Sequence, residues 1–247
     1  GEGADEIFAG YPQYKLMKLR EKFVGNSLFM KSMANFNVNH APNFILDKCF
    51  GFSSQLGVEG KKRFVAFIKA DKFSEQYLQM VSIFNEEEKK ELLNNYSNDF
   101  YEKYKKKFDG NNLIDSCQKF DFKGNMVEDL LMKVDRNTMA FAVEGRVPFL
   151  DYRIVELAFK SPEKFRLNGF KDKFLLRKTF ADKLPKEVSQ RKKKHFFVPI
   201  DSWFQNELTQ VREDLLSNDF LKKQKILSHS YFEKINKGFK ESKLFYS

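Results

Sequence analysis

The sequence of 247 residues contains only two cysteines, Cys49 and Cys117, and neither has a neighbour at metal-ligand spacing. We therefore expect two free thiols in a reducing compartment, with no disulfide framework and no zinc site. No apolar run approaches the ~18 residues that a membrane-spanning helix requires, and no signal-like segment with a basic start opens the chain. Together these absences predict a soluble, cytoplasmic protein.

Glycine- or serine-rich linkers, low-complexity segments and internal repeats are also missing, and strand patterns are scarce. Amphipathic stretches broken by Gly, Asn and Pro instead predict a mainly α-helical chain. The expected helices span residues 5–22, 27–36, 42–50, 58–70, 74–84, 86–96, 97–108, 124–143 and 172–184, with another after Asp151 and two or three short ones after residue 201. Asn85 is expected to cap the helix over 86–96, and the buried side of the helix after Asp151 is expected to consist of Ile154, Val155, Ala158 and Phe159.

The segment 124–143 has the clearest helical pattern. One side is expected to face the core and the opposite side to carry charge. The core-facing positions are Val127, Leu130, Leu131, Val134, Thr138 and Phe141, and the charged ones are Asp129, Lys133 and Arg136. Pro148 ends the segment, and Asp151 is placed to cap the next helix. We expect Glu144, Arg146 and Asp151 to form an ion-pair network around this turn.

Basic residues exceed acidic ones, 44 against 34, for a net charge of +10. Such an excess favours anionic partners, either nucleic acids or small anionic ligands. The lysines occur in short runs separated by acidic stretches, without a zinc-finger, homeodomain or RNA-binding signature. We therefore favour solvated helix faces and keep a helical nucleic-acid-binding module as the alternative. The runs are 61–63, 103–107, 191–194 and 222–225.

Three carboxylates occur at the start of the chain, in the sequence Gly-Glu-Gly-Ala-Asp-Glu. In a helix, Glu2 and Glu6 would repel each other at i, i+4, although a helix N-terminus favours negative charge. Glycines permit close approach of the backbone to a ligand, and Mg²⁺ accepts carboxylate oxygens when it also holds phosphate. The segment indicates either a Mg²⁺–phosphate site or a charged helix cap.

Three later segments bear on this choice. Residues 133–136 read Lys-Val-Asp-Arg, residues 144–151 read Glu-Gly-Arg-Val-Pro-Phe-Leu-Asp, and residues 190–199 read Gln-Arg-Lys-Lys-Lys-His-Phe-Phe-Val-Pro. In this order the segments resemble the synthetase domain of glutamine-dependent asparagine synthetase. That family has Ser-Gly-Glu-Gly-Ser-Asp-Glu, then Lys-Val-Asp-Arg with Glu-x-Arg-Val-Pro-Phe-Leu-Asp, then Arg-Pro-Lys-x-Gly-Phe-x-x-Pro. The resemblance extends from residue 1 to about Phe204.

The resemblance implies that residues 1–247 form the helical C-terminal portion of an ATP-pyrophosphatase α/β domain of the adenine-nucleotide α-hydrolase type. The family's Ser-Gly-Gly-x-Asp-Ser nucleotide loop and its glutaminase cysteine are not found here. We therefore expect a piece of a larger protein that is inactive alone, with the glutaminase domain as its partner and a homodimer as an open alternative. The parent is expected to use ATP and Mg²⁺ to convert aspartate into an acyl-adenylate, which ammonia from glutamine turns into asparagine.

The resemblance also implies roles for individual residues. Asp5 matches the aspartate that holds Mg²⁺ and pyrophosphate, and Glu2 matches the glutamate that handles ammonia and the acyl intermediate as a general base. Lys193 matches the lysine placed over the reacting phosphorus. A further set matches positions near the nucleotide phosphates, with a surface ion pair between Asp129 and Lys133 as the alternative. That set is Lys133, Asp135 and Arg136.

The late segment departs from the family pattern at three positions. Lys192 replaces a proline, His195 replaces a glycine, and Phe197 stands where a small residue is common. These changes leave open another acceptor carboxylate, as in a β-lactam synthetase-like or polysaccharide-pathway enzyme. Retention of Glu2, which such specialised relatives typically lose, favours aspartate.

Overall fold

The computed structural model describes residues 2–25, 27–32, 53–191 and 198–240. The chain divides into two compact units, one made of Gly1–Gly25 and Asp99–Lys194, the other of Asn26–Asn98 and His195–Ser247. Helices make up nearly all the regular structure of the described residues, where β-structure is limited to two isolated bridges, Leu93 with Leu227 and Asn168 with Lys171. The prediction of a mainly α-helical chain is confirmed.

The first unit begins with two helices where the sequence predicted a single one over 5–22. Helix α1 (Ala4–Ile7) ends where the Gly10 N–H donates to the Asp5 carbonyl at 2.8 Å, and Ala9 has a left-handed backbone (φ 54). Helix α2 (Pro12–Phe23) then starts with Pro12, whose missing N–H is not needed in a first turn. The other elements of this unit are α9 (Asp99–Lys105), α10 (Leu113–Lys123), η1 (Met126–Leu130), α11 (Leu131–Met139), η2 (Pro148–Leu150), α12 (Tyr152–Lys160), α13 (Glu163–Arg166), α14 (Phe174–Thr179) and α15 (Lys186–Ser189).

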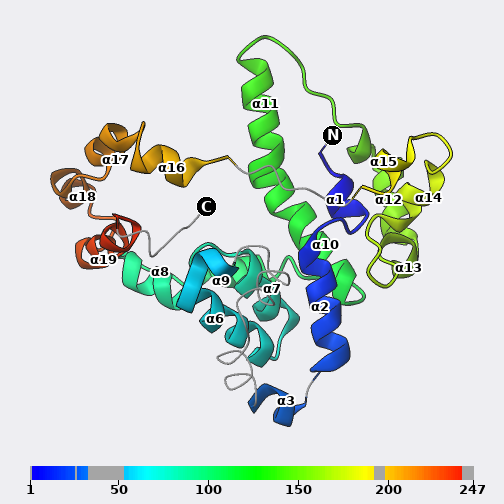
Figure 1. The fold of residues 1–247 in the computed structure, drawn as a ribbon, viewed down its shortest axis with the longest axis horizontal. Coiled ribbons are helices and arrows are strands. Elements are labelled where there is room, and N and C mark those ends of the chain that lie inside the picture. The colour runs from blue at the N-terminus through cyan, green and yellow to red at the C-terminus, as the bar shows by residue number, and fades with distance from the viewer. Residues whose placement is uncertain (1, 26, 33–52, 192–197, 241–247) are drawn as a thin grey trace. The chain divides into compact units, whose positions relative to one another are not determined.

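Helix α10 is at the centre of the first unit, yet the sequence pattern did not predict it. It packs against α1, α2 and η1, and α1 and α2 are the blue helices beside it in Figure 1. The Asn112 side chain caps its start by accepting from the Asp115 N–H at 2.9 Å. Its buried residues include Asp115, Gln118 and Asp121 as well as apolar ones, so no amphipathic stripe marks it. Hydrogen bonds to residues distant in the sequence offset the free-energy cost of burying these polar side chains.

The side of 124–143 that was expected to face the core is half-buried at Leu130, Leu131, Val134 and Thr138, whereas the expectation is wrong for its first and last positions. A π-helical turn, η1, separates α10 from α11, and such a turn inserts an extra residue that rotates all later side chains. Val127 is 55 % exposed and Phe141 is 82 % exposed, and no residue of α11 is buried. The chain does return onto one side of this helix, because a Cβ on Gly145 would lie 2.9 Å from Val134 Cγ1.

Helix α12 packs against α1 and supplies part of the apolar cluster beneath the acidic N-terminal segment. Ile7, Phe8 and Ala158 form a buried cluster, and the half-buried side chains packed against it are Phe122, Phe149, Ile154, Val155, Phe159, Leu175 and Leu176. Asp151 caps α12 as expected, accepting from the Arg153 N–H at 2.9 Å. The expected three-residue network is instead two separate pairs, Glu144 with Arg146 and Asp151 with Arg153.

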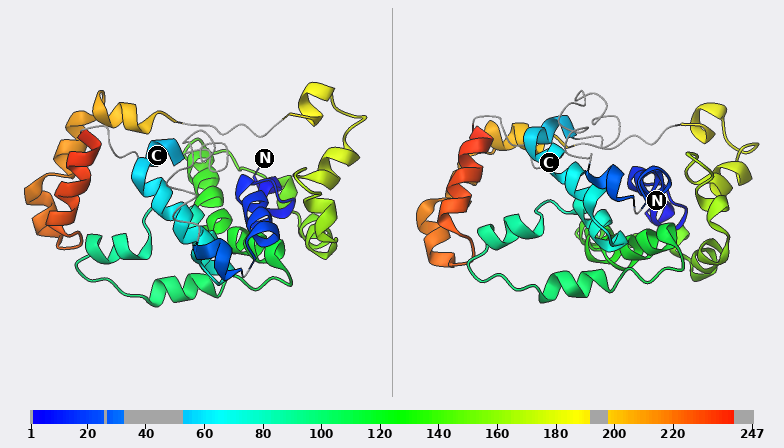
Figure 2. Two further views of the ribbon diagram at one scale, coloured as in Figure 1. Left: turned by 60° about the horizontal axis from the view of Figure 1, so that its bottom comes forward. Right: turned by 90° about the horizontal axis from the view of Figure 1, so that it is seen from below.

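The second unit is held by the packing of α6 (Ser53–Lys69) on α7 (Phe73–Val81). Arg63 donates to the Ser82 carbonyl at 2.7 Å and pairs with Glu88 at 2.7 Å. Glu88 and Asn85 form the capping box of α8 (Glu86–Leu92), which confirms the predicted cap. The remaining helices of this unit are α3 (Leu28–Ser32), α16 (Ile200–Gln205), α17 (Thr209–Leu215), α18 (Asn218–Gln224) and α19 (His229–Lys240), and α18 packs on α19 (Figure 2). The predicted helix 42–50 lies outside the described residues.

Candidate active site

A cavity of about 640 Å³ opens in the first unit beside α1. Its apolar walls come from η2, α14 and the segment through α15, and its polar groups are few and mostly charged. Such a combination is typical of small-molecule sites. The lining residues are Phe149, Leu176, Phe180, Leu184 and Val188 on the apolar side, and Asp5, Lys173, Arg177, Ser189 and Arg191 on the polar side.

Asp5 and Lys173 form an ion pair on this wall, with Asp5 Oδ1 3.0 Å from Lys173 Nζ. Their side chains are 25 % and 21 % exposed, so both remain within reach of a ligand. Lys173 has a left-handed backbone (φ 48), a costly conformation for a residue with a Cβ. Its N–H donates to the Phe8 carbonyl at 3.0 Å, which ties the start of α14 to the end of α1.

Two glycines leave room for this arrangement. A Cβ on Gly10 would lie 2.0 Å from Asp5 Oδ1 and 2.3 Å from Lys173 Cε, so any larger residue would displace the ion pair. Gly3 has φ +97, and its Cβ would meet Leu150 Cδ2 at 2.5 Å. Gly3 therefore allows the chain to pack closely against η2, and Gly10 leaves the space that the Asp5–Lys173 ion pair occupies.

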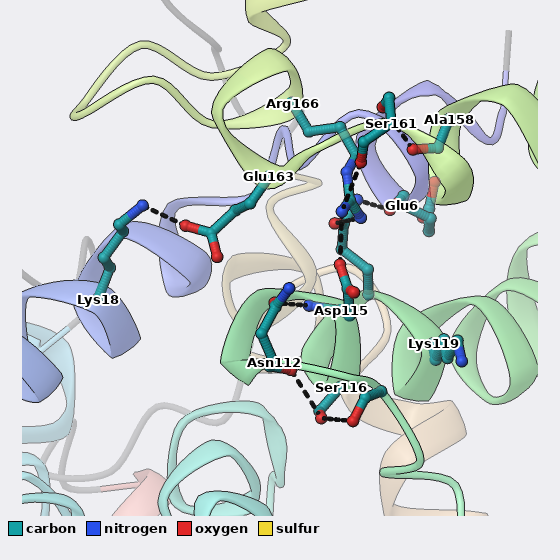
Figure 3. A network of polar contacts seen from close by, with 12 residues as sticks. Glu6, Lys18, Asn112, Asp115, Ser116, Lys119, Ala158, Ser161, Glu163 and Arg166 are labelled. Carbon is teal, nitrogen blue, oxygen red and sulfur yellow. Dashed lines mark hydrogen bonds and ion pairs between the residues drawn. The ribbon is translucent and has the colours of Figure 1, made fainter.

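A buried hydrogen-bond network fixes α1 from below (Figure 3). The Gln118 side chain donates to the Glu6 carbonyl at 2.5 Å and accepts from Arg166 at 2.7 Å, and Arg166 also pairs with Asp115 at 2.5 Å. The Tyr11 hydroxyl donates to Glu6 Oε1 at 2.5 Å. Burial, together with the Glu6 charge and hydrogen bond, raises the pKa of Tyr11 far above its usual range, so the phenol stays a donor. These hydrogen bonds and the ion pair hold α1 against α10.

A second polar network surrounds Asp172, the residue before Lys173. Asp172 pairs with Arg177 at 2.9 Å and with Lys15 of α2. Burial opposes ionisation of Asp172, but the bonds to these two cations outweigh it and lower the pKa of the carboxyl. Arg177 also donates to the Ser189 carbonyl at 2.9 Å and to the Arg191 carbonyl at 3.0 Å.

The structure places the predicted site residues of the first and last segments differently. Asp5 lies on the cavity wall, whereas Glu2 is half-buried and is not one of the lining residues. Lys193 lies outside the described residues, as do Lys192, His195 and Phe197. Arg191, two residues before Lys193 in the sequence, lines the same cavity as Asp5.

The predicted nucleotide-binding set on α11 is not part of the cavity. Lys133, Asp135 and Arg136 are exposed, and within the described part of the chain their side chains form no ion pair or hydrogen bond. The alternative, a surface pair between Asp129 and Lys133, is also not formed among these residues. The role of the set stays a prediction.

Two basic residues at α14 that line the cavity were not singled out by the sequence analysis. Lys173 and Arg177 lie at i, i+4 around α14, a spacing that occurs throughout a chain so rich in lysine and arginine. Only the left-handed backbone of Lys173 and the proximity of Asp5 distinguish them. Neither feature leaves a signal in a single sequence.

Comparison with known proteins shows the family of this chain. A family model described as asparagine synthase matches residues 1–244. The chain belongs to the asparagine synthase family.

Curated relatives carry the same family name. Asparagine synthetase [glutamine-hydrolyzing] 1 of Bacillus subtilis is 31 % identical over 215 residues, which cover 85 % of this chain and 32 % of the relative. The corresponding protein of Gallus gallus is 39 % identical over 97 residues, 35 % of this chain and 17 % of the relative. The chain thus spans about a third of the length of the Bacillus relative. No solved structure matched it significantly.

Membership of the asparagine synthase family makes Mg²⁺ the metal to consider. The described residues contain no group of three or more His, Cys, Asp and Glu that could enclose an ion. Mg²⁺ usually needs only one or two carboxylates, because substrate phosphates and water complete its coordination. A single partly exposed carboxylate at the cavity wall, Asp5, fits that mode of binding.

The other sequence-level expectations concern the surface. Among the described helices, none is both long and apolar enough to cross a bilayer. Lysines of the 103–107 run are held by acids, Lys105 by Glu102 at 3.0 Å and Lys107 by Glu128 at 2.6 Å. Burial raises the pKa of the Cys117 thiol, the buried free cysteine of the described chain, while Cys49 lies outside it.

Proposed function

We propose that this chain is part of an ATP-dependent, amide-forming ligase of the asparagine synthetase type, which converts aspartate to asparagine through an acyl-adenylate and releases AMP and pyrophosphate. Family membership supports the reaction class. The observation that carries the proposal is the Asp5–Lys173 pair on the wall of a cavity large enough for part of a nucleotide or its leaving group. An anionic and a cationic group side by side suit a metal-bound phosphate better than a neutral ligand.

In this proposal Asp5 holds the nucleotide's Mg²⁺, which when bound offsets charge on the pyrophosphate oxygens. Lys173 directs its ammonium group at the same oxygens, and its contact with Asp5 keeps it oriented before the nucleotide arrives. Groups that are already oriented need no reorganisation during the reaction, which is where much electrostatic catalysis originates. Phosphoryl-type chemistry needs little else from a protein.

The remaining site residues keep the roles that the resemblance implies. Glu2 accepts a proton from the attacking ammonia, and Lys193 supplies positive charge at the reacting phosphorus. Lys133, Asp135 and Arg136 contact the nucleotide in the full-length protein. The cofactors of the reaction are ATP and Mg²⁺.

We propose glutamine as the nitrogen donor and a glutaminase domain as the partner that releases ammonia from it. The support is the printed name of the relatives, glutamine-hydrolyzing asparagine synthetases. Because this chain spans only about a third of the Bacillus relative, the partner is sought in the full-length protein.

The test uses the full-length protein and ATP–pyrophosphate exchange with aspartate, followed by detection of asparagine and AMP. We expect exchange that depends on aspartate and Mg²⁺, and its loss in Lys193→Ala while the fold is retained. Exchange with a different carboxylate, but none with aspartate, would move the assignment to a related amidotransferase. No exchange with any carboxylate would refute the ligase assignment, and wild-type exchange in the variant would remove Lys193 from the mechanism.

A further inference from the structure

We propose that Arg177 is a positioning residue that holds the Ser189–Arg191 wall of the cavity in place. The inference rests on the function proposed above for its catalytic consequence, but not for its structural part. Arg177 lines the cavity, and its positive charge alone would suggest a direct contact with phosphate.

The hydrogen bonds of Arg177 argue against a direct phosphate contact. Its Nη1 donates to the carbonyls of Ser189 (2.9 Å) and Arg191 (3.0 Å). Its Nε donates to the Asp172 carbonyl and carboxylate, and its Nη2 donates to the same carboxylate at 2.9 Å. A guanidinium has five N–H groups, so one is left without a partner among the described residues. Most donors of the Arg177 guanidinium are therefore already occupied by groups of the protein itself.

The Nε and Nη2 atoms of Arg177 are anchored by Asp172. The Asp172 side chain is 13 % exposed and binds both Arg177 and Lys15, which belongs to α2. Asp172 is also the residue before Lys173, the partner of Asp5. The same short stretch of backbone therefore carries the lysine of the ion pair with Asp5 and the carboxylate that anchors the guanidinium of Arg177.

The Nη1 atom of Arg177 binds backbone carbonyls that helix α15 leaves without a partner. Helix α15 is a single turn, and the carbonyls at the end of a helix have no partner within it. Ser189 is the last residue of α15 and Arg191 lies just beyond its C-cap, and Arg177 from the neighbouring α14 donates to both carbonyls. A planar guanidinium can bridge two carbonyls and a carboxylate at once, whereas a lysine ammonium cannot reproduce that geometry.

The test compares Arg177→Met and Arg177→Lys with Arg153→Met in the full-length protein. Arg153 is an exposed arginine of the same unit whose charged partner is Asp151, so its variant controls for loss of a charge. Hydrogen–deuterium exchange of residues 185–191 reports the clamp, and ATP–pyrophosphate exchange reports its consequence. We expect faster deuterium uptake there in both Arg177 variants and not in the control.

In the catalytic measurement, we expect both Arg177 variants to lose about 10²-fold in kcat, the size typical of a misplaced catalytic group. KM for ATP should stay within about twofold, because Arg177 makes no ligand contact. Full activity in Arg177→Lys, or a raised KM with unchanged kcat, would show that charge at the ligand matters and would overturn positioning. Unchanged deuterium uptake would overturn the clamp. If the wild type shows no exchange at all, the proposed ligase function fails while deuterium uptake still decides the clamp.

Discussion

The Asp5 segment and helix α11 were both predicted to bind the nucleotide, yet the structure treats them very differently. Asp5 lies on a cavity wall, paired with Lys173, above a buried network that holds α1 on α10. Lys133, Asp135 and Arg136 lie on a helix without a buried residue. A sequence motif therefore indicates candidate site residues. Their side chains are held in a fixed geometry only where neighbouring residues restrict their movement.

The physical origin of the difference lies in what supports each segment. Helix α10 buries charged and amide side chains that bind one another, so what rests on it is held in one place. The π-helical turn η1 then changes the rotation of the chain before α11 begins. Leu131, Val134 and Thr138 share a half-buried side of α11, but no residue of this helix is buried, and its charged residues are exposed.

The largest expected effect tests the network beneath Asp5. Arg166→Met removes one partner of the buried pair with Asp115, whose side chains are 1 % and 9 % exposed. We expect a loss of about 3–5 kcal/mol in the free energy of unfolding, because a charge stays buried without compensation. Arg136→Met on α11 should change it by no more than about 0.5 kcal/mol. Urea denaturation measures both, and equal effects would contradict the contrast between the two regions.

The next effect tests the catalytic side of the comparison. Lys173→Met in the full-length protein should lower ATP–pyrophosphate exchange by about 10²–10³-fold, the usual cost of removing one preorganised electrostatic group. Lys133→Met, an equal change in charge on α11, should cost less. A loss of similar size in Lys133→Met would show that α11 reaches the nucleotide in the full-length protein, and the contrast would then describe this part of the chain alone.

The smallest effect tests the space around the ion pair. Gly10→Ala should reduce exchange by about 10²-fold, because the added Cβ must move Asp5 or Lys173. Gly169→Ala is the matched control, since its φ of +58 is strained but no atom lies within 4 Å of the added Cβ. We expect the control to lose about 1–2 kcal/mol of stability and to keep its activity. Normal exchange in Gly10→Ala would show that the pair tolerates displacement.

Several features could be read from short-range sequence patterns. The caps formed by Asn85 and Asp151 were predicted correctly, because a capping side chain binds backbone groups two or three residues away. The less exposed side of α12 also followed from helical periodicity, with Ala158 buried and Ile154, Val155 and Phe159 half-buried. The single helix predicted over 5–22 was wrong because Gly10 and Pro12 were not read as a break.

Other features depend on residues far apart in the chain. Helix α10 was missed because its buried Asp115 and Gln118 are stabilised by Arg166, about fifty residues later. Lys173 was missed because its importance comes from Asp5, near the other end of the unit. No local pattern contains such a pairing.

The order of residues along this chain was enough to identify its family and its helical character and to single out Asp5 as a candidate site residue, since each of these rests on local motifs and spacing. Which groups meet around the cavity was settled by folding. The ammonium group beside Asp5 and the guanidinium behind Ser189 and Arg191 reach their places through contacts across the unit. Contacts of that kind depend on how helices pack, and packing is a property of the whole set of side chains at once.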